Sequence, residues 1–123
     1  MLAWLIGCAL AGDVAEIDVA ALHTLREEKT AHTLLDVRKE EEVATVRVPG
    51  ITHIPLDQLP ERTDELDKAL PVYVICHSGF RSAKATKLLT EQGFTATNVA
   101  GGTAGWEKAG YPVERGTAVP KEE

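Results

Sequence analysis

Cys76 and Arg81 lie at the junction between an apolar run and an amphipathic stretch, in the sequence VYVICHSGFRSAKATKLL at residues 72–89. The apolar run VYVI predicts a central parallel strand, and residues 82–93 have the spacing of a helix that ends at Gly93. The connection between them therefore lies at the carboxyl edge of the sheet. Open α/β sheets bind their ligands at this edge.

The four residues between Cys76 and Arg81 favour an anion-binding loop. Gly79 lets the chain curl so that successive backbone N–H groups point inward. The amino end of the following helix adds about half a positive charge, and Arg81 and His77 add side-chain donors. A free cysteine has a pKa of about 8.5, and such a field favours its thiolate. The loop therefore predicts a reactive Cys76 that is largely ionised at neutral pH.

A packing role for Cys76 is the main alternative. Cysteine is among the most buried residue types, and a lone cysteine at the end of an apolar strand usually packs in the core. However, an anion-binding loop needs a strand before it, a glycine within it and a helix after it, and all three are present. Their combination favours chemistry over packing.

The chain around this loop alternates short apolar runs with amphipathic stretches, which is typical of a parallel sheet covered by helices. Asp18 is a suitable N-cap for a helix over the residues that follow it. Further strands are expected at 32–37 and 95–99, and further helices at 39–48, 60–70 and 104–109. From residue 110 onward the apolar residues thin out, so we expect this segment to fray.

Composition indicates one domain and excludes some classes of function. The chain has 123 residues, of which 44% are hydrophobic, and a formal charge of −6, which argues against coating nucleic acid or an anionic membrane. Its two cysteines, Cys8 and Cys76, suggest neither a disulfide framework nor a zinc motif. His23 and His32 are isolated, so neither a metal site nor a cofactor is expected.

Residues 1–13 form an apolar segment that is too short to span a bilayer and lacks the basic residues of a secretory signal. We favour a strand or helix packed on the domain; the alternative is the end of a longer membrane anchor. The first interpretation makes a cytoplasmic location the default, and the second implies a membrane-anchored or periplasmic protein. The expected domain covers residues 14–115, followed by a flexible tail at 116–123.

The segment CHSGFRS at 76–82 resembles the active-site loop of single-domain rhodanese-like sulfurtransferases, which commonly show C-x-S-G-x-R-S there. Three other segments resemble that family: LLDVRKEEEV at 34–43, PGITHIPL at 49–56 and NVAGGTAGWEKAGYPVE at 98–114. The resemblance implies a rhodanese-like α/β fold, with a mostly parallel sheet of about five strands and helices on both faces. Residues 46–48 depart from the usual G-H-I, and we expect this change to alter a structural turn.

The resemblance also implies transfer of a sulfane sulfur through a persulfide on Cys76. The donor would be a small sulfur-containing anion such as thiosulfate, and the acceptor cyanide or a thiol, including that of a small redox or sulfur-carrier protein. The expected substrate-binding residues are His77, Ser78, Gly79, Phe80, Arg81 and Ser82. Their N–H groups would hold the terminal sulfur much as an oxyanion hole holds oxygen.

Individual roles within this loop differ. Arg81 either binds the donor's oxygens, which we favour, or caps the loop. The Ser82 hydroxyl either contacts sulfur or, as we favour at a helix start, satisfies the backbone. Phe80 and His77 are expected to shape the entrance.

Smaller predictions concern residues outside the loop. Asp36 and Arg38 are expected to form an internal ion pair or a loop anchor. Trp106 and Tyr111 are expected to pack in the core or under a lid, and Glu40–Glu42 to form a solvated face.

Two other functions remain open. A cysteine-dependent phosphatase uses a similar loop, but such enzymes place one residue more between Cys and Arg and need a general acid, for which no motif is present. A non-catalytic sulfur-relay or protein-binding module is the second alternative.

Overall fold

The computed structural model describes residues 14–116 of the chain. Five parallel strands form one sheet in the order β1-β6-β5-β2-β4. They are β1 (Glu16–Asp18), β2 (Thr33–Asp36), β4 (Thr52–His53), β5 (Val72–Ile75) and β6 (Ala96–Ala100). The predicted α/β fold with about five parallel strands is confirmed. The apolar segment at 1–13 and residues 117–123 of the expected tail lie outside the described residues.

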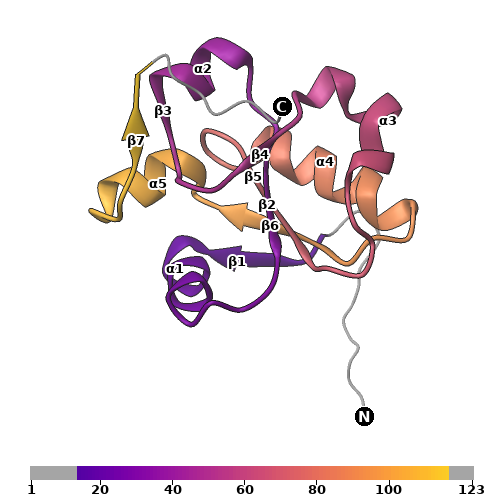
Figure 1. The fold of residues 1–123 in the computed structure, drawn as a ribbon, viewed down its shortest axis with the longest axis horizontal. Coiled ribbons are helices and arrows are strands. Elements are labelled where there is room, and N and C mark those ends of the chain that lie inside the picture. The colour runs from indigo at the N-terminus through magenta and orange to yellow at the C-terminus, as the bar shows by residue number, and fades with distance from the viewer. Residues whose placement is uncertain (1–13, 117–123) are drawn as a thin grey trace.

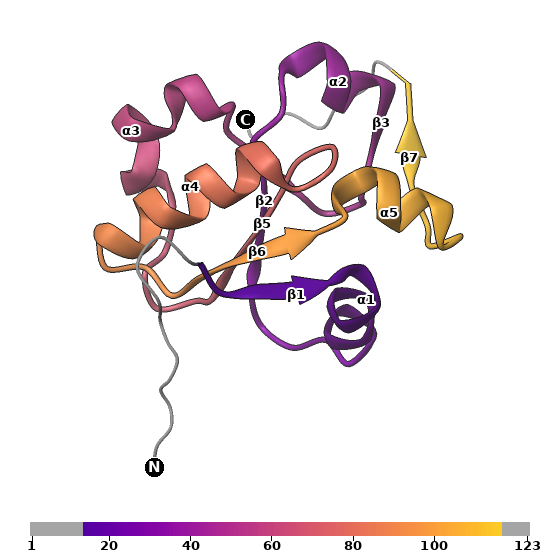
Figure 2. The same cartoon turned by 180° about the vertical axis from the view of Figure 1, so that it is seen from behind.

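Helices cover both faces of this sheet (Figures 1 and 2). One face packs against α1 (Val19–Glu27) and α5 (Gly102–Lys108), and the other against α3 (Leu59–Arg62) and α4 (Phe80–Glu91). A further helix, α2 (Glu40–Thr45), follows β2. This arrangement places two separate apolar clusters on opposite sides of the strands.

The central strand β5 shows how sequence alternation builds both clusters. Val72, Val74 and Cys76 belong to the cluster beneath α4, whereas Ile75 belongs to the cluster beneath α1 and α5. Successive side chains of a strand point to opposite faces, and residues covered on both faces form a continuous apolar run. The side chain of Cys76 therefore lies on the α4 side of the sheet.

Helix α4 begins two residues earlier than the sequence predicts. Gly79 is its N-cap, with a φ of 120°, and the helix runs from Phe80 to Glu91. Gly93, with a φ of 95°, follows the helix as predicted. The earlier start places Ser82 inside the first turn of α4, where its backbone N–H is directed at the Cys76 loop.

The single helix predicted over residues 60–70 is wrong. The chain instead forms α3 and two 3₁₀ turns, η2 (Leu56–Gln58) and η3 (Thr63–Glu65). The Asp67 carboxylate accepts a hydrogen bond of 2.9 Å from the Ala69 N–H, which offers the backbone an alternative to a helix. Pro71 also disfavours helical backbone at the residue before it. Leu66 is nevertheless buried, as predicted.

A second, two-stranded sheet corrects the prediction that the chain frays from residue 110. Strands β3 (Val46–Arg47) and β7 (Glu114–Arg115) pair in antiparallel fashion. The buried Arg47 side chain donates to the carbonyl oxygens of Val43 and Gly116 and forms an ion pair with Glu114. These bonds hold the carboxyl-terminal segment in place as far as Gly116.

Candidate active site

The loop that contains Cys76 lies between β5 and α4, at the carboxyl edge of the parallel sheet. Cys76 follows β5 directly, and the positive φ of Gly79 turns the chain back toward the sulfur. Glycine adopts this conformation without the steric cost that a Cβ brings. The placement predicted for the loop is confirmed.

Three polar hydrogens from the loop and helix start converge on the sulfur of Cys76. The Gly79 N–H donates to Sγ over 3.1 Å, and the Ser82 N–H and hydroxyl each donate over 3.3 Å. Cys76 itself is only 1% exposed. The thiol is thus buried, but the groups that face it from the loop are hydrogen-bond donors, which favour a negatively charged sulfur.

These donors outweigh the effect of burial on the pKa of Cys76. Burial alone raises the pKa of a thiol, because the thiolate loses its contact with water. Hydrogen bonds from the Ser82 hydroxyl and from the N–H groups of Ser82, Gly79 and Ser78 lower it by more. The net result is a Cys76 pKa below its ordinary value, in the direction that a nucleophile requires.

The role of the Ser82 hydroxyl differs from the one favoured on the sequence. It does not cap the helix but donates to the sulfur, because Ser82 lies in the first turn rather than at the helix start. The nearby Thr86 hydroxyl donates to the Ser82 carbonyl oxygen over 2.7 Å and does not touch Cys76. The two buried hydroxyls of α4 therefore differ in whether they reach the thiol.

Replacing Ser82 with alanine is expected to slow alkylation of Cys76 by iodoacetamide at pH 7 by roughly fivefold, the factor that corresponds to a hydrogen bond of about 1 kcal/mol. The pKa of Cys76 rises in this variant, so the pH profile of alkylation moves to higher pH. Thr86→Val is the matched control, since it removes a buried hydroxyl that does not reach the sulfur. An unchanged profile for Ser82→Ala would contradict the assignment.

Asn98 supports the same loop from behind and was not identified from the sequence. Its side-chain amide donates to the Gly79 carbonyl oxygen over 3.3 Å and to the Glu16 carboxylate over 3.0 Å. Asn98 lies in β6 and is buried. The sequence does contain a signal for Asn98, because it is a polar residue within a strand that is covered on both faces. A buried side-chain amide needs hydrogen-bond partners, so such a residue indicates a structural contact.

Arg81 forms an ion pair with Glu42, a residue 39 positions earlier in the chain. Two guanidinium nitrogens donate to the two carboxylate oxygens over 2.7 and 3.0 Å. The Arg81 hydrogen bond, partly opposed by burial, lowers the pKa of Glu42 to about 2. The prediction that residues 40–42 form a solvated face is therefore wrong for Glu42, which also accepts a hydrogen bond from the Lys39 N–H.

The Glu42–Arg81 ion pair is expected to stabilise the fold by at most about 1 kcal/mol, because both side chains keep about a third of their exposure to solvent. Since folding depresses the pKa of Glu42 from 4.5 to about 2, its contribution is complete above pH 4.5 and lost as the pH falls toward 2. Urea unfolding of Glu42→Gln and wild type should therefore converge across this range. Glu41→Gln, an exposed neighbour, is the control, and a difference that does not vary with pH would contradict the interpretation.

Asp36 and Arg38 form the internal ion pair that the sequence predicts. Arg38 Nε and Nη2 donate to the Asp36 carboxylate over distances from 2.9 to 3.2 Å. Arg38 Nη2 also donates to the Val46 carbonyl oxygen over 2.7 Å, and the His53 ring contacts the Arg38 carbonyl oxygen. The pair therefore connects the end of β2 to β3 and β4 beside the Cys76 loop.

The remaining predicted loop residues lie at the surface. His77, Ser78 and Phe80 are exposed, and Phe80 is 85% exposed, the largest exposed apolar side chain among the described residues. Their positions are compatible with a role at the entrance to the site. Such a role stays a prediction for these three residues.

The first turn of α5 packs directly against the backbone of the Cys76 loop. The Thr103 N–H donates to the Cys76 carbonyl oxygen over 2.8 Å, and the Ala104 N–H to the His77 carbonyl oxygen over 3.0 Å. Gly102, with a φ of 61°, lies so close to these two carbonyl groups that a Cβ at this position would overlap them. This contact brings α5 to the carboxyl edge of the sheet.

Trp106 and Tyr111 pack as predicted. Trp106 is buried, and its indole N–H donates to the Pro112 carbonyl oxygen over 2.7 Å. His23 stacks on Tyr111, with ring centroids 4.0 Å apart, and meets Trp106 edge-on. His23 therefore belongs to an aromatic cluster that joins α1 to the segment after α5.

The described residues contain no group of three or more His, Cys, Asp and Glu side chains arranged to hold a metal ion. Within residues 14–116, no helix combines the length and apolar character that crossing a membrane requires.

The sequence of residues 18–109 matches the rhodanese-like domain family. The chain belongs to this family. The match covers the Cys76 loop, both flanking elements and α5, so the resemblance seen in the sequence is confirmed. The family assignment also agrees with the five-stranded parallel sheet.

One protein similar to this chain is YtwF of Bacillus subtilis, which has a provisional sulfurtransferase name. The two are 42% identical over 95 residues, and this match covers 77% of this chain and 92% of YtwF. YrkF of the same organism, provisionally named a sulfur carrier protein, is 36% identical over 97 residues; these cover 78% of this chain but 52% of YrkF. Several other relatives are named thiosulfate sulfurtransferases.

Among solved structures, a rhodanese-related protein from Thermoplasma volcanium is similar to most of this chain. Its TM-score is 0.74 at 34% sequence identity, and the match covers 81% of this chain and 97% of that protein. The fold and the family are thus shown, and the relatives carry sulfurtransferase names.

Proposed function

We propose that this rhodanese-like domain transfers a sulfane sulfur from a small anionic donor to a thiophilic acceptor through a persulfide on Cys76. The observation that supports this proposal most directly is the convergence of the Gly79 N–H, the Ser82 N–H and the Ser82 hydroxyl on Sγ. A ring of donors around one sulfur stabilises a thiolate before reaction. The same ring suits the persulfide, which is also an anion.

In the first step, the Cys76 thiolate attacks the outer sulfur of a donor such as thiosulfate. A bond forms between Sγ and that sulfur, and the sulfur–sulfur bond of thiosulfate breaks. The bonding electron pair leaves with sulfite. No external oxidant or reductant is needed, because the sulfane sulfur moves from one nucleophile to another.

In the second step, an acceptor such as cyanide or a thiolate attacks the terminal sulfur of the persulfide. The bond between that sulfur and Sγ breaks, and its electron pair returns to Cys76 as the thiolate. The products are thiocyanate from cyanide and a new persulfide from a thiol. In this scheme the Cys76 loop holds one negative charge in both stages, on Sγ in the thiolate and on the terminal sulfur in the persulfide.

The other loop residues have proposed roles that follow from their positions. The N–H groups from His77 to Ser82 hold the terminal sulfur, and Phe80 and His77 shape the exposed entrance. Arg81 supports the thiolate through its positive charge and binds the donor's oxygens. Because Glu42 already holds two of its guanidinium nitrogens, the ion pair fixes where that charge is presented.

Intact-mass spectrometry after treatment with thiosulfate tests the proposal. The protein should gain the mass of one sulfur atom, located on Cys76 by peptide mapping, and lose it on addition of cyanide as thiocyanate appears. Absence of the adduct and of thiocyanate would contradict the proposal. Hydrolysis of a phosphate ester under the same conditions would instead favour the phosphatase alternative.

A further inference from the structure

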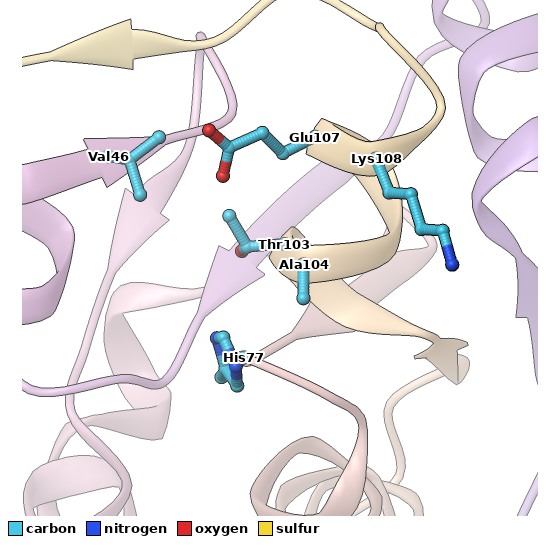
Figure 3. A pocket seen from close by; sticks show the side chains of 6 residues that line it. All are labelled: Val46, His77, Thr103, Ala104, Glu107 and Lys108. Atoms are coloured by element: carbon cyan, nitrogen blue, oxygen red, sulfur yellow. The ribbon is translucent and has the colours of Figure 1, made fainter.

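A cavity of about 320 Å³ lies beside the Cys76 loop at α5, and Figure 3 shows the six side chains that line it. The lining includes His77, Thr103 and Ala104 but not Cys76. The Cys76 side chain belongs to the cluster beneath α4, on the other side of the sheet. The contacts that orient the sulfur therefore come from the α4 side and not from this cavity.

Asn98 is a buried polar residue on the α4 side of the sheet. In β6, Ala96 belongs to the cluster beneath α4, whereas Val99 belongs to the cluster beneath α1 and α5. Since side chains alternate along a strand, Asn98 shares the α4 face with Ala96. Asn98 is 1% exposed, and its register partner in β5 is Val74, two residues before Cys76. The buried amide therefore lies on the same face of the sheet as the Cys76 thiol.

The groups around Asn98 decide which way its amide points. Nδ2 donates to the Glu16 carboxylate over 3.0 Å and to the Gly79 carbonyl oxygen over 3.3 Å. A carboxylate and a carbonyl oxygen only accept hydrogen bonds, so the amide nitrogen and not the amide oxygen must face them. Asn98 Oδ1 is buried and has no hydrogen-bond partner within residues 14–116. The amide is thus held by the two bonds that it donates.

The unsatisfied Oδ1 argues that Asn98 does more than stabilise the fold. A buried acceptor without a partner destabilises the folded state, and replacing a buried polar group by an apolar one of the same shape is often neutral. An apolar side chain at residue 98 would also extend the cluster that contains Ala96 and Val74. It could not, however, donate to the Gly79 carbonyl oxygen. The contact with Gly79 is therefore the property of Asn98 that stability alone does not explain.

The orientation of Gly79 depends on hydrogen bonds, because glycine has no side chain that packing could hold. Its N–H donates to the Cys76 Sγ over 3.1 Å. Its carbonyl oxygen accepts from the Asn98 amide and, over 3.2 Å, from the Ala83 N–H in α4. Only two soft dihedral angles separate the N–H from the carbonyl group of one residue. Holding the Gly79 carbonyl group therefore limits the directions in which the Gly79 N–H can point.

We propose that Asn98 is a positioning residue for the Cys76 nucleophile, which holds the Gly79 carbonyl group so that the Gly79 N–H stays directed at Sγ. Glu16 holds the Asn98 amide in the orientation that this contact requires. Asn98 acts through Gly79 and makes no contact with the sulfur. The inference rests on the proposed function, in which the Gly79 N–H stabilises first the thiolate and then the persulfide.

Alkylation by iodoacetamide tests the role of Asn98 without sulfur transfer. The parent protein is Cys8→Ser, in which Cys76 is the only thiol. In this parent, Asn98→Leu should slow alkylation at pH 7 by about two- to fivefold, the range that one hydrogen bond supplies. The pH profile of alkylation should move to higher pH and the Gly79 amide proton resonance should shift, while the urea midpoint stays close to that of the parent. An unchanged pH profile would overturn the inference, whatever the midpoint.

Two further variants separate positioning from general effects on the fold. Thr97→Val, at the neighbouring position of β6 whose side chain points to the opposite face, is the matched control and should keep the parent's profile. Glu16→Ala, at an exposed residue, should slow alkylation by about twofold, because the Asn98 amide loses one of its two acceptors. Loss of a negative charge alone would favour the thiolate, so electrostatics predicts the opposite sign. Equal slowing in Thr97→Val, or faster or unchanged alkylation in Glu16→Ala, would contradict the proposed contacts.

Kinetics of sulfur transfer then connects this contact to the proposed function. With thiosulfate and cyanide, kcat/KM of Asn98→Leu should fall by about the same factor as its alkylation rate. If the parent forms the persulfide but Asn98→Leu keeps the parent's alkylation profile, the inference is overturned and the proposed function stands. If the parent forms no persulfide, the proposed function is contradicted, and the role of Asn98 in sulfur transfer is overturned with it even where the alkylation profile shifts.

Discussion

Replacing Cys76 with serine is expected to lower the rate of thiocyanate formation from thiosulfate and cyanide by at least about a thousandfold, because the proposed chemistry is covalent and the serine hydroxyl does not ionise at neutral pH. The same variant should gain no sulfur in intact-mass spectrometry after thiosulfate treatment. Its fold should persist, since serine is close to cysteine in volume. Circular dichroism and urea unfolding of the variant verify this point.

The sequence offers a direct control for this experiment in its second cysteine. Cys8→Ser removes the other thiol of the chain and should leave both the adduct and the thiocyanate rate at wild-type levels. If Cys76→Ser kept its activity, or if the adduct appeared on Cys8 instead, the proposed nucleophile would be wrong. The two variants together therefore assign the reactive sulfur without relying on the family resemblance.

The second large effect is expected in stability, from Asp36→Ala. This change leaves the Arg38 guanidinium, which is 2% exposed, without its buried carboxylate. Removing one partner of a buried ion pair typically costs about 3–5 kcal/mol, because the other charge remains desolvated. Since small domains are stable by only about 5–15 kcal/mol, urea unfolding of Asp36→Ala should occur at a much lower midpoint.

A surface aspartate serves as the comparison for this variant. Asp57 is exposed, and its replacement by alanine should change the free energy of unfolding by no more than about 0.5 kcal/mol. If Asp36→Ala were as stable as Asp57→Ala, the pair would not carry the stabilising role that its burial indicates. Replacement of both Asp36 and Arg38 by apolar residues should recover part of the loss, because no unpaired charge would remain.

The sequence predicted the central strand, the Cys76 loop and helix α4 because these depend on neighbouring residues. The apolar run of β5, Gly79 and the amphipathic pattern after it are local signals that agree with one another. The internal Asp36–Arg38 pair was also predictable, since two opposite charges at the end of a buried strand need each other. Because these neighbouring signals agree with one another, the sequence alone predicts where most of the candidate site lies.

Contacts between distant segments were not predictable in the same way. Glu42 meets Arg81 only because the fold brings α2 close to the first turn of α4, and on the sequence Glu42 is one of three consecutive glutamates. The pairing of Val46–Arg47 with Glu114–Arg115 likewise depends on the position of α5. A strand of two residues is too short to show an alternating pattern in the sequence. The segment from residue 110 onward, which has few apolar residues, was therefore expected to fray.

Small shifts in element boundaries explain the remaining differences at the site. Placing the start of α4 two residues late made Ser82 look like a helix cap instead of a donor to the sulfur. The predicted helix over residues 60–70 had apolar residues at helical spacing, but the Asp67 side chain and Pro71 interrupt it. A side-chain hydrogen bond and a proline decide the backbone within residues 60–70, and Gly79 sets the start of α4, whereas periodicity records none of these.

Gly102 lies so close to the carbonyl groups of Cys76 and His77 that no side chain fits between α5 and the Cys76 loop. Two hydrogen bonds from the next two residues fasten the helix to the same carbonyl groups. A displacement of α5 would therefore also move the peptide planes of Cys76 and His77. A residue with a Cβ at position 102 would displace either α5 or the peptide planes of Cys76 and His77, so the spacing of this junction depends on glycine.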